Sequence, residues 1–300
     1  MSCFYPRLAV DYGVDPDTGK HHIKFVPERV DTQTNINALR SKWGSSLLLL
    51  PCGQCLGCKF DIARDWATRC VCESLYHEKN CFVTLTYDEV HVPERVIRSD
   101  VQDFIKALRN RGVKLRFFGS AEYGCENHRP HYHLILFGYE PTDLKLFSKS
   151  NGFFLYTSNT FSSIWNKGFV LVGSLSFESA GYVARYATKK LKDEDSFLFM
   201  SNRPGIGYQY YLDHREEMIK EGKIYGKFGE RSTQPIPRYF DSKLREDFPE
   251  EYQKLVDKRL KDIQVVDNAN MANLKVVHLE QLKIHQAEAA FDKLSRIGRM

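Results

Sequence analysis

The sequence predicts an α+β fold, in which helices pack on an antiparallel sheet. Segments of strand composition alternate with amphipathic helical segments in the order β-α-β-β-α-β-α between residues 81 and 192. Two of these strands are separated only by a short polar loop, as antiparallel neighbours are. The chain has 300 residues, of which 42% are hydrophobic and 27% charged, so it is long enough to bury such a core.

Hydrophobic periodicity and turn residues set the bounds of the expected elements. They are, in order, a helix over 59–77, a strand over 81–87, a helix over 100–110 with Ser99 as its N-cap, strands over 114–122 and 131–138, a helical or irregular piece over 143–166, a strand over 169–175 and a helix over 177–192. Beyond residue 195 the chain looks looser, and 250–296 are expected to form two polar helices.

Two histidines at the start of the strand over 131–138 indicate a metal site. His131 and His133 are two residues apart, so their side chains lie on the same face of the strand. Their Cα atoms would be roughly 6–7 Å apart, which lets two imidazoles converge on one cation. Pro130 has no amide hydrogen and suits the first position of a strand. A lone histidine on an apolar face is usually a core residue, but a pair on one face favours a cation.

Glu122 is the candidate oxygen ligand. It ends the preceding strand, and antiparallel pairing of the two strands would bring it beside the histidines. Two imidazoles and one carboxylate leave coordination positions open, which suits Mg²⁺ or Mn²⁺ and also accepts Zn²⁺. The alternative is a surface glutamate at a turn.

The helix over 177–192 carries Tyr182 and Tyr186, which lie one turn apart. An apolar stripe on this helix is expected to face the sheet, with both tyrosines on the opposite side and Lys189 and Lys190 near them. Ionising a tyrosine hydroxyl at pH 7 requires about 4 kcal/mol, so a nucleophilic tyrosine needs a nearby cation. Two ordinary surface tyrosines are the alternative, and the histidine pair favours two nucleophiles for phosphodiester chemistry.

Composition excludes some classes of protein. No stretch approaches the roughly 20 apolar residues of a membrane span. Eight cysteines without a secretory leader indicate a reducing compartment, so a cytoplasmic protein with no membrane partner is expected. The formal net charge of +5 permits nucleic-acid binding without arguing for it.

Three motifs, taken in order, resemble the HUH endonucleases, which initiate rolling-circle replication or mobilise single-stranded DNA. They are Phe82–Tyr87, Arg129–His133 and Tyr182–Tyr186 with the two lysines that follow. The chain is most similar to the replication initiators of Microviridae phages of the gokushovirus type. The segments 51–58 and 204–207 add to the likeness, which extends over residues 1–240.

This resemblance implies an HUH/RRM-like core with a five-stranded antiparallel sheet over 81–195. An N-terminal Cys-rich element and helix would occupy 1–80, and an extension with a helical tail 196–300. It implies a metal-dependent endonuclease and strand transferase that nicks origin DNA, forms a 5′-phosphotyrosine adduct and rejoins the displaced circle. It also implies a host helicase as partner and the bacterial host cytoplasm as location.

Cys52, Cys55 and Cys58 form a C-x₂-C-x₂-C motif that offers three soft metal ligands. The family likeness also begins near Cys3, which makes it the expected fourth ligand of a structural zinc site. Other candidates for this fourth position are His21, His22, Cys70 and Cys72. An iron–sulfur cluster and unliganded reduced thiols are the alternatives, although the Cys-Pro pair that often ends a cluster motif is absent.

Single-stranded DNA is the expected partner. Basic residues gather over 106–116 and again over 215–245, where tyrosines are interleaved, a composition that suits phosphates and stacked bases. Arg185, Lys189 and Lys190 are the preferred contacts because they lie on the tyrosine helix. Two alternative functions stay open: a two-tyrosine transposase or relaxase of the same superfamily, and a non-catalytic RRM-like nucleic-acid-binding protein with a zinc knuckle.

Overall fold

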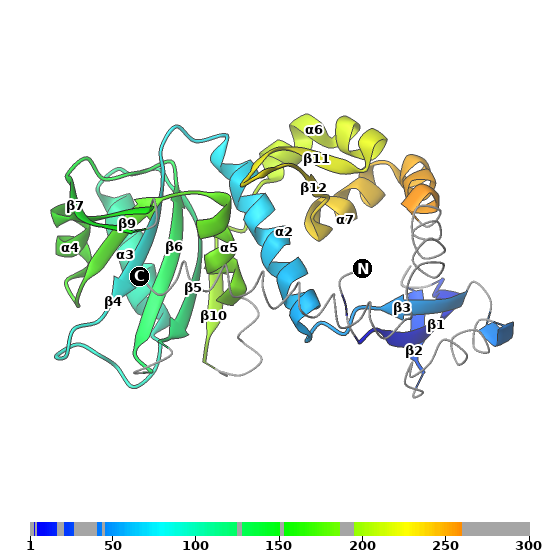
Figure 1. The fold of residues 1–300 in the computed structure, drawn as a ribbon, viewed down its shortest axis with the longest axis horizontal. Helices are drawn as coiled ribbons and strands as arrows, with labels where there is room; N and C mark the ends of the chain where they lie inside the picture. The colour runs from blue at the N-terminus through cyan, green and yellow to red at the C-terminus, as the bar shows by residue number, and fades with distance from the viewer. Residues whose placement is uncertain are drawn as a thin grey trace. The chain divides into compact units, whose positions relative to one another are not determined.

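The computed structural model describes residues 3, 5–16, 21–26, 41–43, 46–124, 128–150, 153–186 and 195–259. These residues belong to two compact units, one within Met1–Asp61 and the other within Ile62–Asn273 (Figure 1). The expected division of the chain at residues 80 and 195 stays a prediction.

The N-terminal unit contains a three-stranded antiparallel sheet in the order β2-β1-β3. Its strands are β1 (Arg7–Val14), β2 (His21–Phe25) and β3 (Leu47–Leu50). Helix α2 (Leu56–Ser74) follows β3 after a short loop and continues into the second unit. This helix confirms the one expected over 59–77, with a start three residues earlier.

The second unit contains an antiparallel sheet of seven strands, which confirms the α+β class and corrects the expected five strands. Its order is β10-β5-β6-β4-β9-β8-β7. The strands are β4 (Asn80–Thr86), β5 (Arg116–Tyr123), β6 (Pro130–Phe137), β7 (Leu144–Ser150), β8 (Phe153–Ser158), β9 (Val170–Ser174) and β10 (Phe197–Met200).

Additional strands extend the sheet at both edges. At one edge, β10 pairs with β5 and buries Phe197 and Phe199. At the other edge, β7 and β8 form a hairpin within 143–166, where a helical or irregular piece was expected. β7 exposes Leu146 and Phe147 and its register shifts near Ser148, so it lacks the clean alternation by which a strand is identified in a sequence.

Helices cover both faces of this sheet. On one face, Val83, Leu85 and Leu134 pack in a core that includes residues of α3 (Arg98–Asn110) and α4 (Asn159–Trp165). On the other face, Phe118 and Ile135 pack with α5 (Phe177–Tyr186) and α2. Figure 1 shows α5 alongside β5 and β6, the two strands it contacts. Alternation along the strands therefore sends the histidine face toward α5.

The start of α3 differs from the prediction. The helix begins at Arg98, its N-cap is Ile97, and Ser99 lies inside the first turn rather than at the cap. The Tyr132 hydroxyl explains this start because it accepts a hydrogen bond from the Ile97 amide (2.9 Å) and donates one to the Ile97 carbonyl (2.7 Å).

The chain beyond residue 195 is more ordered than expected. After β10 come α6 (Tyr208–Glu221), β11 (Lys223–Phe228), β12 (Arg231–Pro235), α7 (Arg238–Asp247) and a helix over 249–259. Large apolar side chains of these elements form a third core, with Tyr211 and Phe240 fully buried in it. The rest of the predicted polar helices lies outside the described residues. Among the described helices, none combines the length and apolar character needed to cross a bilayer.

The 204–207 segment joins this third core to α2. The buried Glu73 carboxylate accepts hydrogen bonds from the Gly207 amide (2.6 Å) and from Arg116 Nε (2.5 Å). Arg69 donates to the Ile206 carbonyl (3.0 Å). Gly207 has a φ of 78°, and a side chain there would meet Phe240, so the position requires glycine.

Candidate active site

The register of β5 and β6 brings the three predicted metal ligands together. Glu122 lies directly opposite His131, and Ser120 lies opposite His133. Opposed residues of an antiparallel pair point to the same face, so Glu122 is the direct neighbour of one histidine and the diagonal neighbour of the other. The sequence prediction for Glu122 relied on this pairing.

The ligand atoms of this group converge on one point. Glu122 Oε1 lies 2.9 Å from His131 Nε2 and 3.0 Å from His133 Nε2. One nitrogen or oxygen atom from each of the three residues lies within 4.8 Å of the others. A cation could replace the hydrogen-bonded contacts with only small movements of the three side chains.

A second contact orients each imidazole. His131 Nδ1 is 3.1 Å from the Arg129 carbonyl oxygen, and His133 Nδ1 is 3.0 Å from Thr84 Oγ1. Because the carbonyl can only accept, His131 Nδ1 carries a proton, which leaves Nε2 of the neutral ring as a lone-pair donor. Thr84 lies opposite His133 in the β4–β6 register. The sequence prediction missed Thr84 as a site residue, although alternation along the strand places it on the face opposite Val83 and Leu85.

The electrostatics of the group favour an ionised carboxylate. Glu122 is 2% exposed, and burial alone would raise its pKa. The hydrogen bonds from His131 and His133 outweigh burial and lower the pKa of Glu122 to about 2. The carboxylate is therefore a charged oxygen donor at neutral pH, as a hard divalent cation requires.

Tyr182 lies against this group. Its ring meets the His133 ring edge-on, with centroids 4.9 Å apart, and also contacts Phe82 at 6.2 Å. Its hydroxyl is 3.5 Å from His133 Nε2, the outer limit of a hydrogen bond. Tyr182 is 8% exposed, so the expectation that it faces away from the sheet is wrong. The stripe of α5 packs against both the sheet and α2, which leaves the Tyr182 side of the helix over the histidines.

Other predicted residues of this helix are described less fully. Tyr186 ends α5, four residues after Tyr182. The side chains of Tyr186 and Arg185 lie outside what the structure describes, and so do Lys189 and Lys190 entirely.

The cysteine cluster assembles in the N-terminal unit. Cys3, Cys52, Cys55 and Cys58 bring their sulfur atoms within 4.8 Å of one another. Of the other candidates for the fourth position, Cys70 and Cys72 are buried in two apolar cores along α2. His21 pairs with Asp11 at 2.7 Å, and His22 packs near Tyr12.

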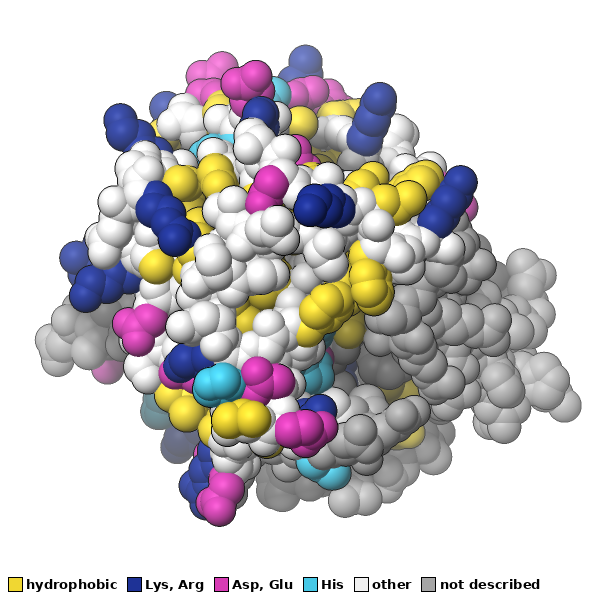
Figure 2. All heavy atoms as spheres, turned by 90° about the vertical axis from the view of Figure 1, so that its left-hand side faces the viewer, with side chains coloured by type: hydrophobic (Ala, Val, Ile, Leu, Met, Phe, Trp, Pro, Cys, Tyr) yellow, Lys and Arg dark blue, Asp and Glu magenta, His cyan; other side chains and the backbone are white. Residues whose placement is uncertain are grey.

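The basic run over 106–116 does not act as one patch. Arg116 pairs with the buried Glu73, and Arg109 donates to the Leu115 carbonyl (3.4 Å). Lys106 and Arg109 line a cavity between α3 and β10, together with Phe117 and Phe199. Figure 2 views the molecule from the end that carries β7 and α4, and there lysines and arginines are dispersed among neutral and acidic side chains.

Comparison with known proteins places the chain in a family. The model of the replication-associated protein ORF2 family matches residues 80–191. The chain is 33% identical over 228 residues to the replication-associated protein ORF2 of Spiroplasma virus 4, an alignment that covers 68% of this chain and 70% of the relative. The replication-associated protein VP4 of Bdellovibrio phage phiMH2K is also 33% identical, over 254 residues, or 75% and 80% of the two chains.

The chain belongs to this family of phage replication-associated proteins. A third relative, ORF4 of Chlamydia phage 1, is 29% identical over 262 residues, or 78% of this chain and 63% of the relative. These comparisons confirm the expected likeness to the Microviridae replication initiators. No solved structure matches the replication-associated protein. The family match over 80–191 spans β4 to α5 and so includes Glu122, both histidines and Tyr182.

Proposed function

We propose that this replication-associated protein is an HUH-type, metal-dependent DNA endonuclease and strand transferase. It nicks single-stranded origin DNA through a tyrosine, holds the cut end as a 5′-phosphotyrosine adduct and rejoins the displaced circle. Membership in the replication-associated family supports a role in phage DNA replication, and the geometry around His133 supports the chemistry.

One observation carries the proposal. A tyrosine hydroxyl lies 3.5 Å from an imidazole nitrogen that is itself 3.0 Å from a buried carboxylate. These groups come from α5, β6 and β5, far apart in the sequence. A phenol, two imidazoles and a carboxylate at one point are the groups that a tyrosine nucleophile and a divalent cation need.

Glu122, His131 and His133 would hold Mg²⁺ or Mn²⁺. The donor set fits such an ion, because the carboxylate is ionised and both Nε2 atoms lie beside it. When bound, the ion polarises the scissile phosphate and stabilises the negative charge that develops on it. Three protein donors leave coordination positions for phosphate oxygens and water.

Tyr182 is the proposed first attacker because its hydroxyl lies beside the ligand group. Its oxygen forms a bond to phosphorus as the bond from phosphorus to the 3′ oxygen breaks. The phenol gives up its proton, and the departing strand keeps a 3′-hydroxyl. Tyr186, one turn later on α5, is the proposed second nucleophile, which attacks a new junction while the first adduct persists. The free 3′-hydroxyl then attacks a phosphotyrosine, which releases the tyrosine and closes the circle.

Cationic side chains on the tyrosine helix are proposed to bind the DNA strand. Arg185, Lys189 and Lys190 lie within or just after α5, so their charges would be close to the phosphates next to the cleaved bond. We also propose a host helicase as partner and the host cytoplasm as the place of action, both from the family likeness.

A covalent-adduct experiment tests the proposal. The protein is incubated with labelled single-stranded origin DNA and Mg²⁺ or Mn²⁺, and an SDS-resistant protein–DNA adduct is expected. Tyr182→Phe with Tyr186→Phe should abolish the adduct, because only the two hydroxyls are lost, and should leave DNA binding nearly unchanged. Tyr225→Phe, at an exposed tyrosine of β11, is the matched control and should keep wild-type adduct formation.

Two results would overturn the proposal. DNA that is bound but recovered intact under all metal conditions would favour a non-catalytic nucleic-acid-binding protein. An adduct that survives the double change would mean that another residue is the nucleophile.

A further inference from the structure

We propose that Cys3, Cys52, Cys55 and Cys58 bind one tetrahedral zinc ion that fastens the start of the chain to the loop between β3 and α2. This site is separate from the proposed nuclease site and does not depend on the nuclease activity. Its four ligands all lie in the N-terminal unit.

The sulfur–sulfur distances fit a single ion. Cys52 Sγ is 3.9 Å from Cys58 Sγ, and Cys55 Sγ is 3.9 Å from Cys3 Sγ. Four sulfurs at the usual Zn–S distance of about 2.3 Å form a tetrahedron with edges of roughly 3.8 Å. A disulfide would hold two sulfurs at about 2.05 Å, so these cysteines are not bonded in pairs.

The same distances argue against an iron–sulfur cluster. Such a cluster places several iron and sulfide atoms between its cysteine thiolates and holds those thiolates further apart than a single ion does. Here all four sulfurs lie within 4.8 Å of one another, which leaves space for one ion. Four thiolates around one ion form a closed coordination sphere, typical of a structural site rather than a catalytic one.

Backbone amides support the sulfur atoms. The amide of Cys52 donates to Cys3 Sγ (3.2 Å), that of Cys55 to Cys52 Sγ (3.3 Å) and that of Cys58 to Cys55 Sγ (3.5 Å). These bonds turn partial positive charge toward three of the sulfurs, as thiolate ligands of a metal require. A backbone that curls around the sulfurs in this way is therefore built for negative charge at its centre.

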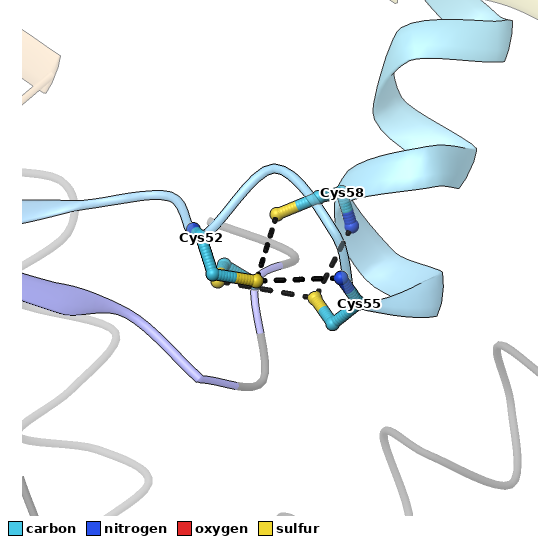
Figure 3. Close-up of side chains that lie close together, drawn as sticks. Cys52, Cys55 and Cys58 are labelled. Atoms are coloured by element: carbon cyan, nitrogen blue, oxygen red, sulfur yellow. Dashed lines mark hydrogen bonds between the residues drawn. The ribbon is translucent and has the colours of Figure 1, made fainter. Parts of the chain in front are cut away.

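Local chain geometry directs the sulfurs inward. Figure 3 shows Cys52, Cys55 and Cys58 pointing their sulfurs toward one another from the loop and the first turn of α2. Gly53, with a φ of 76°, lets the loop turn back after Cys52. C-x₂-C spacing with a glycine inside is the usual form of such a loop in zinc sites.

The position of the site explains what the ion would do. Arg7 of β1 pairs with Leu50 of β3, so Cys3 and Cys52 lie just beyond the same end of this strand pair. The sheet of this unit has three short strands, and β3 is only four residues long. A core this small is marginal without a cross-link, and a zinc ion provides one between segments 49 residues apart.

Metal analysis of the full-length protein tests the site. Purified wild-type protein should contain about one zinc per chain and no sulfide, and X-ray absorption should find four sulfur neighbours at about 2.3 Å. The His131→Ala/His133→Ala variant should keep this zinc, which separates it from any ion at the nuclease site. Cys3→Ser should lose it, whereas Cys72→Ala, at a buried thiol of the same helix as Cys58, should keep it.

A variant that does not fold cannot decide the question, so the wild-type measurement comes first. Wild-type protein without stoichiometric metal, or with iron and sulfide in place of zinc, would overturn the proposal. A zinc ion with nitrogen or oxygen neighbours, or one retained in Cys3→Ser with four sulfur neighbours, would also contradict the assignment of these ligands.

Discussion

The two clusters of metal-ligand residues are built in different ways. Glu122, His131 and His133 lie on neighbouring strands of a seven-stranded sheet, and strand register sets their spacing. The cysteine cluster lies on a loop, the first turn of a helix and the start of the chain, and backbone amides hold its sulfurs. One group therefore depends on the fold of a large unit, whereas the other helps to form a small one.

The donor sets differ in the same sense. Three nitrogen and oxygen donors leave an ion open to substrate, and a tyrosine hydroxyl lies next to that open side. Four sulfur donors close the coordination sphere and leave no position for substrate. The comparison predicts that changes at the first group remove activity, while changes at the second remove structure.

The largest expected effect is that of His133→Ala on adduct formation. Loss of an outer-shell partner alone reduces metal affinity or activity by about 10–100-fold, so loss of a proposed ligand should reduce the rate by more than about 100-fold. His91→Ala, at an exposed histidine paired with Asp88, is the control and should have no effect. Equal rates for wild type and His133→Ala would remove the histidine from the mechanism.

A second prediction concerns acid stability and Glu122. Burial opposes ionisation, but hydrogen bonds from the two histidines lower the pKa of Glu122 from 4.5 to about 2. A carboxylate whose pKa is lower in the folded state contributes stability above the unfolded pKa, and this contribution is lost as pH falls through the folded value. The full contribution is about 3 kcal/mol, and about 2 kcal/mol of it should disappear between pH 6 and pH 3.

Urea unfolding without added divalent cations measures this effect. The free energy of unfolding of wild type should fall toward that of Glu122→Gln across this pH range. Glu250→Gln, at an exposed position, should keep a constant difference from wild type. A difference between wild type and Glu122→Gln that does not change with pH would show that the carboxylate is not held as described.

Thr84→Val should have a smaller effect, because Thr84 contacts His133 and not the ion. Loss of its hydroxyl leaves His133 Nδ1 without an orienting partner and should raise the Mn²⁺ concentration for half-maximal adduct formation about 10-fold. Thr86→Val is matched on the same strand, because the Thr86 hydroxyl bonds to the Phe169 carbonyl instead. If both variants require the same Mn²⁺ concentration, Thr84 does not position the ligand.

The smallest expected effect is that of Lys189→Ala with Lys190→Ala on DNA affinity. Each phosphate contact to a single strand contributes about 0.7 to the slope of log affinity against log salt concentration. Loss of two contacts should reduce this slope by about 1.4 in a fluorescence-anisotropy titration. The exposed pair Lys254→Ala with Lys258→Ala removes the same charge and should leave the slope unchanged, and equal slopes for both pairs would exclude the two phosphate contacts.

Local patterns in the sequence predicted the centre of the molecule well. Alternation placed His131 and His133 on one face of a strand, and the short connection between β5 and β6 made Glu122 their neighbour. The spacing of the cysteines likewise predicted a cluster, and the structure adds Cys3 to it. Each of these predictions depended on residues close in sequence or on strands joined by a short loop.

The predictions that failed depended on contacts between distant segments. Whether β10 joins the sheet is decided by its pairing with β5, about 80 residues earlier in the chain. Tyr182 was expected to face away from the sheet because helical periodicity shows one apolar stripe, whereas α5 packs against both the sheet and α2. The buried Glu73 that receives Arg116 and the Gly207 amide has no local pattern at all.

Mass spectrometry of the covalent adduct tests the central claim most directly. Adduct formed with Mg²⁺ or Mn²⁺ is digested with protease and nuclease, and the peptide that carries a nucleotide through its 5′ phosphate is sequenced. The proximity of Tyr182 to His133 and Glu122 predicts that the modified residue is Tyr182 or, one turn later, Tyr186. A nucleotide on any residue outside α5 would contradict the account.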